Sequence, residues 1–257
     1  ILEYKNFLYE RLNQYDSAIY TSRKVIDLVE KRNDSISIGR IYPKMAYYFK
    51  MNKQKDSAFK YYNLTENTYL KYNDSVSNGR YLLDLAILQS DYGDYNGSDE
   101  TGTLALIYSN DKDSLNSASV YNCWAISSKK QNKFKEAVGY YEKAIELTTS
   151  KTSKIKYLNH KANALRYLKE YNKSITLFNE LLKDSILNGM PKTKARIIDN
   201  FAYTKWLANT NENVLPELKK ALAIRFQEND LYGSIASYAH LSEYYTEESH
   251  DSIVICF

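Results

Sequence analysis

The chain has 257 residues, of which 44% are hydrophobic and 26% charged, with only 3 prolines and 8 glycines. So few turn-forming residues exclude a many-stranded sandwich or barrel and a disordered low-complexity chain, and 2 cysteines exclude a small disulfide-framed domain. The formal net charge of +4, from 35 basic and 31 acidic residues, is too small to indicate nucleic-acid binding by itself.

The sequence shows neither a membrane-spanning segment nor the pattern of a secretory signal peptide. No run of apolar residues is long enough to span a bilayer, and no charged segment followed by an apolar one opens the chain. Because the chain starts at Ile1, we expect it to be part of a longer protein. We expect a cytoplasmic protein, or a periplasmic one if a signal peptide precedes Ile1.

A short motif recurs along the whole chain. Segments such as Tyr15-Asp-Ser-Ala-Ile, Phe134-Lys-Glu-Ala-Val and Tyr171-Asn-Lys-Ser-Ile place a small residue at intervals of 37 to 40 residues. A second small residue lies 12 positions before it in the copies that carry Ala46, Ala86, Ala125 and Ala162. Two independent columns at one period predict a repeat protein.

In chain order, the repeats predict seven helical hairpins in a single all-α repeat domain. The predicted units are residues 1–33, 34–73, 74–112, 113–151, 152–188, 189–229 and 230–257. In the fourth unit, apolar spacing predicts one helix over Ser114–Lys130 and a second over Phe134–Thr149. Small residues at the repeated positions would let helix axes approach closely.

Several residues mark helix ends or irregular turns. The Asp-Ser pairs at Asp34, Asp74 and Asp113 are expected to cap the first helix of the next unit, and Pro191 to open a helix. Pro43 predicts that its helix either starts late, near Ile41, or kinks. In the third unit, Gly97 and Gly102 indicate a hinge or a close ligand approach; ordinary repeat decay is the alternative.

These units resemble the tetratricopeptide repeat. The match is best at Phe134-Lys-Glu-Ala-Val-Gly-Tyr-Tyr-Glu-Lys-Ala-Ile-Glu-Leu, preceded by Tyr121, Trp124 and Ala125. The resemblance implies a right-handed α-solenoid in which one helix series lines a concave face that binds peptides or helices. The residue motifs of the repeats are most similar to those in the tetratricopeptide regions of bacterial regulatory proteins, although the period exceeds the usual 34 residues.

The sequence contains no recognisable catalytic, cofactor or metal motif, so we expect a protein that is not an enzyme and has no cofactor. The histidines His160, His240 and His250 lie in different units and are expected to pack rather than to act as ligands or bases. Cys123 and Cys256 lie too far apart in a solenoid for a disulfide and are expected to be inert packing thiols.

The resemblance also implies which helix positions line the concave groove. Counted from each repeated alanine, those positions hold more Lys and Arg than Asp, with aromatic rings and amides between them. The predicted partner-binding residues are Arg40, Tyr47, Lys50, Arg80, Asn122, Lys129, Lys130, Lys156, Asn159, Asn163, Arg166, Tyr167, Arg196, Tyr203 and Trp206. This composition suits an acidic or carboxylate-bearing peptide, whereas an ordinary solvated helix face is the alternative.

Three functions stay open at this point. The groove predicts a non-enzymatic protein- or peptide-binding scaffold, in the sensory or interaction region of a bacterial regulator. The alternative is a self-association module that forms a homodimer through the solenoid ends, and single-stranded nucleic-acid binding is weaker. Most of the 26 tyrosines, such as Tyr62 and Tyr141, fall on packing positions, so their number mainly reflects the repeated core.

Overall fold

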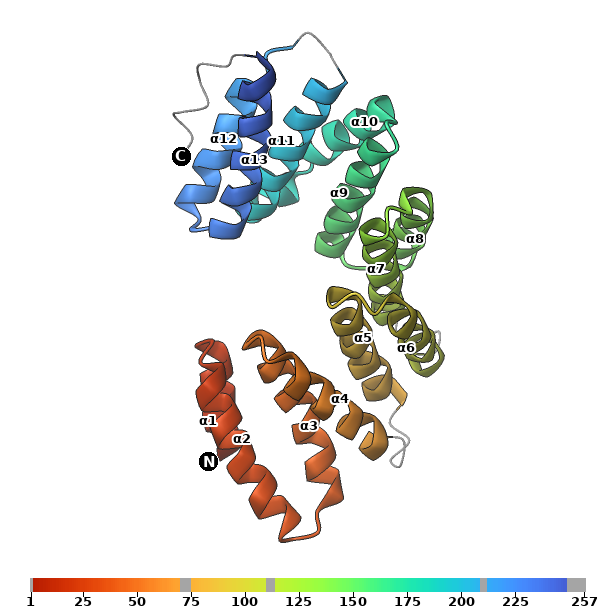
Figure 1. Ribbon diagram of the computed structural model, residues 1–257, viewed down its shortest axis with the longest axis vertical. Helices are drawn as coiled ribbons and strands as arrows, with labels where there is room; N and C mark the ends of the chain where they lie inside the picture. Colours follow the sequence, from red (N-terminus) through yellow and green to blue (C-terminus); the bar gives the residue numbers. More distant parts are fainter. Residues whose placement is uncertain (1, 70–74, 110–113, 209–211, 249–257) are drawn as a thin grey trace. The chain divides into compact units, whose positions relative to one another are not determined.

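The computed structural model describes residues 2–69, 75–109, 114–208 and 212–248, and these form thirteen α-helices and one 3₁₀ helix without any strand (Figure 1). The chain divides into two compact units, Ile1–Trp124 and Ala125–Phe257, and the division falls inside one helix, α7. The predicted all-α repeat architecture is therefore confirmed for the described residues. The seven-unit boundaries stay a prediction.

Unit 1 consists of three helix pairs and the beginning of α7, with consecutive helices in contact (red to yellow in Figure 1). Its helices are α1 (Leu2–Arg11), α2 (Tyr15–Glu30), α3 (Ser35–Met51), α4 (Lys55–Tyr69), α5 (Ser75–Asp91) and α6 (Tyr95–Ser109).

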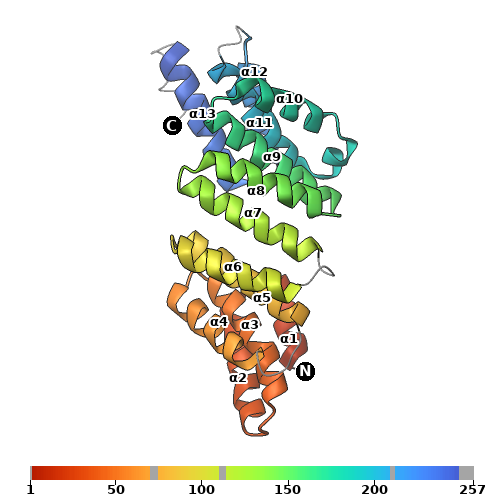
Figure 2. The ribbon, with the colours of Figure 1, turned by 90° about the vertical axis from the view of Figure 1, so that its right-hand side faces the viewer.

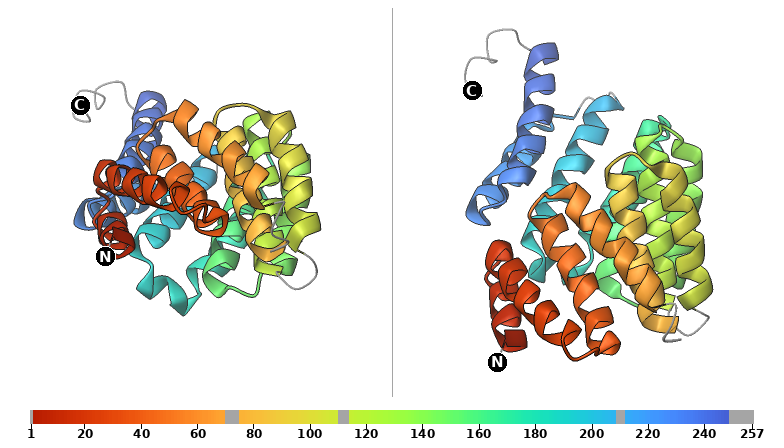
Figure 3. Two further views of the ribbon diagram at one scale, coloured as in Figure 1. Left: turned by 90° about the horizontal axis from the view of Figure 1, so that it is seen from below. Right: turned by 60° about the horizontal axis from the view of Figure 1, so that its bottom comes forward.

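Unit 2 holds the remainder of α7 (Ser114–Lys130) and six further α-helices. These are α8 (Phe134–Leu147), α9 (Lys151–Tyr167), α10 (Tyr171–Leu182), α11 (Pro191–Leu207), α12 (Leu215–Gln227) and α13 (Leu231–Glu248), with a 3₁₀ turn, η1, at Ser185–Gly189. Helix α9 lies between α8 and α10 (Figure 2), and α11 contacts both α9 and α13. Figure 3 shows the same helices in two further views.

The small residues of the repeat lie where helices touch. Both alanine columns are fully buried, and each member is 0% exposed: Ala18, Ala58 and Ala137 in one column, Ala46, Ala86, Ala125, Ala162 and Ala202 in the other. Where serine replaces alanine, its hydroxyl is satisfied inside the packing: Ser174 Oγ donates to the Ala162 carbonyl at 2.7 Å. A larger side chain at these positions would separate the helix axes, which explains the period of the pattern.

The turn within each of five hairpins uses the same backbone device. One residue adopts a left-handed conformation in each turn, and these residues are Asn13, Lys53, Gly93, Asn132 and Lys169. The next backbone N–H then reaches back to a carbonyl of the preceding helix, as in Lys133 N to Ser128 O at 2.8 Å. This helix ending satisfies carbonyls that would otherwise be left unbonded, and it reverses the chain within three residues.

The helix-end predictions are mostly confirmed, with one correction. Asp34 caps α3 by accepting from the Ser37 N–H at 3.1 Å, and Pro191 is the first residue of α11. Asp74 and Asp113 lie outside the described residues. The predicted late start near Ile41 is wrong: α3 begins at Ser35 and continues through Pro43, because the Asp34 cap fixes its start two turns earlier.

Gly102 in α6 makes room for a tryptophan. A Cβ atom at Gly102 would lie 2.6 Å from Nε1 of Trp124, so the missing side chain permits the ring to approach the helix backbone. Trp124 also packs edge-on to Tyr121, with ring centroids 5.4 Å apart. The close approach predicted at Gly102 is therefore made by the Trp124 side chain, which belongs to the same unit.

We expect Gly102→Ala to destabilise the protein by about 1–3 kcal/mol, because the added methyl group overpacks against Trp124. Gly139→Ala is the matched control: Gly139 lies inside α8, and a Cβ there meets nothing within 4 Å. Alanine should stabilise that helix by about 1 kcal/mol. Urea unfolding monitored by circular dichroism measures both. Equal signs for the two substitutions would contradict the packing role of Gly102.

Among the described residues, no helix has the length and apolarity needed to cross a membrane. Cys123 is a buried free thiol, 4% exposed, and its Sγ lies 3.8 Å from Ser98 Oγ, which agrees with the predicted packing role. Cys256 lies outside the described residues.

Candidate functional site

The strongest electrostatic feature of unit 2 is a group of cations around His160 on α9. Burial and, to a smaller extent, the positive charges of Lys129, Arg196 and Lys156 together lower the pKa of His160 to about 4. Lys156 and Arg196 are exposed, and Lys129 is half-buried. Arg166 lies close enough to Lys129 to lower the pKa of that lysine. Helices α7, α9 and α11 thus group four basic side chains: Lys129, Lys156, Arg166 and Arg196.

Arg166, at the end of α9, is the most deeply placed of these cations. It is only 8% exposed. Its guanidinium carbon lies 5.3 Å from the centroid of the Tyr167 ring and 4.9 Å from that of Tyr203. Within the part of the chain that the structure describes, its Nη1 has no hydrogen-bond partner. A buried, unsatisfied guanidinium nitrogen is costly, so it indicates a missing partner.

Stacked rings continue on both sides of Arg166. The Phe134 and Tyr167 rings are parallel within 4°, with centroids 4.8 Å apart, and Lys129 Nζ lies 5.3 Å from the Tyr167 centroid. The rings of Tyr203 and His240 stack at 3.9 Å and 12°. Cation–π and stacking contacts of this kind hold side chains in fixed positions at a surface.

Tyr203 also donates its phenolic hydrogen to the Glu243 carboxylate. Burial raises the pKa of Tyr203, and the hydrogen bond to Glu243 raises it further, so the phenol stays protonated at neutral pH. The hydrogen bond fixes Glu243 of α13 next to the stacked rings.

His240 is hydrogen-bonded to the buried carboxylate of Asp199. Asp199 of α11 is 0% exposed, and its Oδ2 lies 3.0 Å from His240 Nδ1. The same carboxylate accepts from Ser237 Oγ at 3.1 Å and from Arg225 Nη2 at 3.3 Å. Because Nδ1 is engaged by Asp199, Nε2 is the ring nitrogen of His240 that can reach a ligand.

A hollow of about 400 Å³ lies beside these residues, between α9, α10, α11 and α13. Arg166, Tyr203, His240 and Glu243 line it, and Leu207, Ala236 and Ala239 add apolar wall. The hollow therefore combines one buried cation, two hydrogen-bond acceptors and aromatic and apolar walls, which is the usual composition of a ligand pocket.

The contacts around Arg166 follow a second sequence pattern, separate from the alanine columns. Lys129, Arg166, Tyr203 and His240 recur at equal intervals of 37 residues, and we call them the 37-residue column. Each member interacts with the next: Lys129 with Arg166, Arg166 with Tyr203, and Tyr203 with His240. Sequence reasoning gave His240 a packing role and did not identify Glu243 or Arg225.

Two predicted groove residues are internal. Asn159 and Asn163 are 2% and 7% exposed. Asn163 Nδ2 donates to the Asn159 carbonyl at 3.0 Å, and Asn200 Nδ2 donates to Asn159 Oδ1 at 3.3 Å. The Asn159 amide therefore lies at the contact of α9 with α11, and the buried Asn163 amide bonds within α9. Both are internal, as is usual for buried polar groups that bond within the protein.

The other predicted residues of unit 2 lie at the surface to different degrees. Lys130 and Tyr167 are exposed, and Tyr203 and Trp206 are half-buried. The Trp206 ring centroid is 5.5 Å from that of Tyr203, so the tryptophan extends the aromatic wall.

The predicted residues of unit 1 form no comparable cationic group. Arg40 and Arg80 are exposed, whereas Tyr47, Lys50 and Asn122 are half-buried. Lys50 lies close enough to Asp84 to oppose the rise in that carboxyl's pKa that desolvation causes. An acid therefore offsets the charge of Lys50, in contrast with the group around His160.

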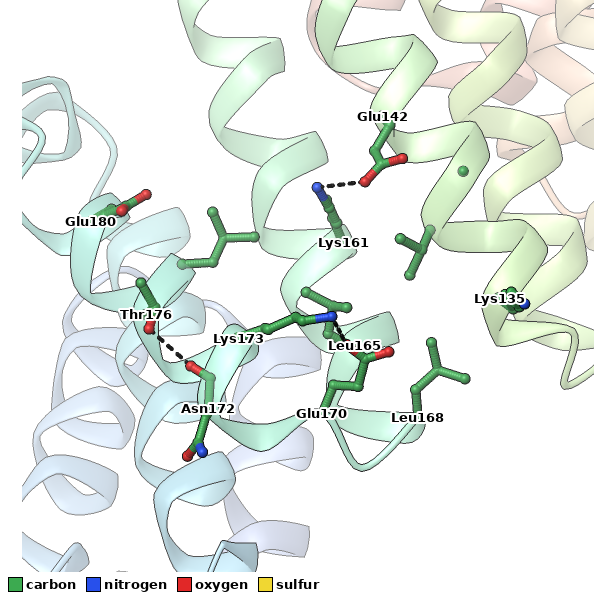
Figure 4. A pocket seen from close by; sticks show the side chains of 13 residues that line it. Lys135, Glu142, Lys161, Leu165, Leu168, Glu170, Asn172, Lys173, Thr176 and Glu180 are labelled. Carbon is green, nitrogen blue, oxygen red and sulfur yellow. Dashed lines mark hydrogen bonds and ion pairs between the residues drawn. The ribbon is translucent and has the colours of Figure 1, made fainter.

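A larger hollow of about 690 Å³ lies between α8 and α10 over α9 (Figure 4). Its walls are largely apolar, with Leu165 and Leu168 visible at its centre, and none of the predicted site residues lines it. The hollow is lined by three basic and three acidic side chains, and four of these form ion pairs: Lys161 Nζ lies 2.9 Å from Glu142 Oε1, and Lys173 Nζ lies 2.5 Å from Glu170 Oε2. It therefore presents less uncompensated charge than the hollow beside Arg166.

No family model and no curated protein matches the chain. Solved structures with a similar fold include RapI in its apo form, which is 14% identical with a TM-score of 0.76 over 95% of this chain and 69% of that chain. BtubC from P. vanneervenii is 17% identical, with a TM-score of 0.70 over 84% and 92%. A tetratricopeptide repeat protein from Parabacteroides merdae is 12% identical, with a TM-score of 0.63 over 99% and 94%.

These similarities define the class of fold: the chain is an all-α, tetratricopeptide-like helical repeat solenoid. The predicted resemblance is confirmed at that level. Such repeats typically serve as interaction scaffolds, because stacked hairpins create extended surfaces for other proteins.

Proposed function

We propose that this chain is a non-enzymatic protein-interaction module whose cationic face in unit 2 binds an acidic segment of a partner protein. We define the cationic face as Lys129, Lys156, Arg166 and Arg196 with the adjoining rings of Tyr167 and Tyr203. The observation that carries the proposal is the grouping of cations with rings: Lys129 Nζ lies 5.3 Å from the Tyr167 centroid and the Arg166 guanidinium 4.9 Å from that of Tyr203. Lys156 and Arg196 are exposed on α9 and α11. Clustered cations beside a fixed aromatic surface attract carboxylates and raise association rates.

The biological setting follows from the sequence. The repeated residue motifs resemble those of the tetratricopeptide regions of bacterial regulatory proteins, and we infer an interaction or sensory role in such a regulator. A cytoplasmic location stays a prediction, with the periplasm as the alternative.

Binding of a fluorescent oligoglutamate peptide, followed by fluorescence anisotropy, tests this function. The double variant Lys156→Glu, Arg196→Glu changes two exposed side chains and should weaken binding by about tenfold or more, since each reversal replaces attraction by repulsion. The matched control is Lys219→Glu, Lys220→Glu on α12, which makes the same charge change on exposed residues outside the face. It should bind as the wild type does.

The salt dependence of binding and the affinity for single-stranded nucleic acid complete the test. Binding through exposed charges must weaken as salt is raised, because counterions screen them. Affinity that is insensitive to salt, or equal loss in both double variants, would contradict the proposal. Tighter binding of single-stranded oligouridylate than of oligoglutamate would favour the nucleic-acid alternative instead.

Self-association is the second candidate, favoured by exposed apolar side chains on α13. Leu231, Tyr232 and Ile235 are 73%, 81% and 66% exposed, and the segment from Leu231 to Ala239 carries no charge. Tyr4 on α1 and Leu12, directly after α1, are likewise exposed. A homodimer through α13 should dissociate in Ile235→Lys. Sedimentation that shows a monomer at all concentrations would exclude this candidate.

A further inference from the structure

Gly139 in α8 has no side chain although the protein around it leaves room for one. A Cβ atom added there would meet nothing within 4 Å, whereas at every other glycine in the described α-helices it would lie 3.2 Å or less from another atom. Glycine also weakens the interior of a helix relative to alanine. The chain therefore gives up helix stability where no internal contact requires it, which indicates a close approach from outside.

The repeat shows that the position of Gly139 faces outwards. Counted from the repeated small residue, the matching positions on the other hairpins hold Tyr20, Lys60, Glu100 and Thr176. These four residues are all exposed. The missing side chain thus opens the hollow of about 690 Å³ between α8 and α10, which we call the α8–α10 groove (Figure 4).

The two walls of the α8–α10 groove follow one pattern. Both helices line it with residues at positions i, i+3, i+4 and i+7: Lys135, Val138, Gly139 and Glu142 on α8, and Lys173, Thr176, Leu177 and Glu180 on α10. Each wall thus runs from a lysine through uncharged residues to a glutamate, over about 10 Å of helix axis. Leu165 and Leu168 of α9 add an apolar floor. The groove is therefore basic at one end, apolar in the middle and acidic at the other end.

One charge at each end of the groove is left over after the ion pairs. The two pairs described above neutralise one lysine at the basic end and one glutamate at the acidic end. Within the part of the chain that the structure describes, Lys135 and Glu180 belong to no ion pair, and they lie on opposite sides of the hollow (Figure 4). A complementary partner therefore carries an acidic group and a basic group about two helical turns apart, with apolar groups between them.

We propose that the α8–α10 groove docks an amphipathic α-helix of a partner protein, whose backbone passes close to Gly139. Side chains at i+3 and i+4 of that helix fill the apolar middle, and opposite charges at i and i+7 meet Lys135 and Glu180. A glycine at the crossing point lets two helix axes approach closely. The inference goes beyond the cationic face and does not depend on it, because no residue of that face lines the groove.

A model helix tests the groove. The probe is an alanine- and glutamine-based helical peptide of about 20 residues that carries glutamate, two leucines and lysine at positions i, i+3, i+4 and i+7. Two control peptides carry glutamate at both charged positions, or lysine at both. Titrations into isotope-labelled wild-type protein are followed by NMR at the Gly139 N–H and the methyl groups of Leu165 and Leu177. We expect saturable shifts with the probe and about fivefold weaker binding of either control, since each control brings one like charge to the rim.

The variant Gly139→Gln separates docking from folding. Glutamine is a better helix former than glycine, so urea unfolding should show a variant at least as stable as the wild type. Its side chain occupies the middle of the groove, and binding of the probe should weaken by about tenfold or more. The matched control is Lys60→Gln, which places the same side chain at the equivalent exposed position of α4. It should bind within about twofold of the wild type.

Each outcome supports or overturns the helix site. Probe binding that persists in Gly139→Gln, equal binding of the two control peptides, or no saturable shift at Gly139 overturns it. Shifts of the same resonances when the protein is concentrated without peptide assign the groove to a second copy of this chain and overturn the partner helix. Oligoglutamate binding should be unchanged in Gly139→Gln, and probe binding should be unchanged in the Lys156, Arg196 double variant, so this proposal and the proposed function fail separately.

Discussion

Asp199→Asn is expected to lower the free energy of unfolding by about 3–5 kcal/mol, the largest effect of any single substitution proposed for this protein. Arg225 is 2% exposed, and its Nη2 contacts Asp199 Oδ2 at 3.3 Å. Removing the carboxylate charge would leave the buried guanidinium without its ion-pair partner, with Asp230 as the remaining nearby anion. Asparagine keeps one oxygen that can accept from Ser237, but it replaces the Oδ2 that His240 and Arg225 share, so contacts between α11, α12 and α13 would weaken.

Chemical denaturation of purified variants measures this effect. Glu142→Gln is the control, because it removes a carboxylate from an ion pair with Lys161 whose Glu142 side chain is 56% exposed. Exposed pairs contribute about 0–1 kcal/mol. The double variant Asp199→Asn, Arg225→Met should lose less than the sum of its single variants, because neither buried charge then lacks a partner. A loss in Asp199→Asn no larger than in Glu142→Gln would refute the role of the buried pair.

Protonation of His160 is expected to destabilise the folded protein by about 3 kcal/mol between neutral pH and pH 4. Burial and then the charges of Lys129, Arg196 and Lys156 lower its pKa to about 4, whereas an unfolded histidine titrates near 6.5. A depressed histidine pKa means that the folded state favours the neutral ring. This contribution is therefore complete above pH 6.5 and is lost as pH falls through 6.5 towards 4.

Two measurements check the effect of His160. Titration of the imidazole C–H resonances by NMR should give an apparent pKa near 4 for His160, and Lys129→Gln should raise it by removing one nearby cation. In His160→Gln, the fall in stability over the same pH window should be smaller than in the wild type. Parallel pH profiles for the two proteins would show that His160 does not contribute.

The repeat itself was predictable because packing repeats. Each hairpin needs a small residue where two helices touch, so burial of Ala18, Ala137 and Ala162 follows directly from their spacing. The same reasoning predicted α7 at Ser114–Lys130 without error. Of the two alternatives predicted at Pro43, the late helix start is wrong, because the cap at Asp34 fixes the start and the helix tolerates one missing N–H. The kink stays a prediction.

The site was predictable only in part. Charge counting along helix positions predicted Lys129, Lys156, Arg166 and Arg196 as groove residues, because their spacing follows the helix periodicity. It could not separate Asn159 from those residues, since the phase of a helix face is uncertain by about one position over 3.6 residues per turn. The internal hydrogen bond from Asn200 decides that Asn159 is structural.

The sequence by itself determined the class of this protein, an all-α repeat solenoid. The prediction that most tyrosines lie in the repeated core is only partly confirmed: among the described residues, Tyr48, Tyr62, Tyr81, Tyr141 and Tyr157 are buried. The fold class depends on local periodicity and on residue size, which a linear pattern records. Only the tertiary structure decided that Arg166 is buried against the Tyr203 ring with Nη1 unsatisfied, and that Asp199 joins Arg225 and His240. Those contacts join side chains 26 to 41 residues apart, and their distances depend on how successive hairpins pack.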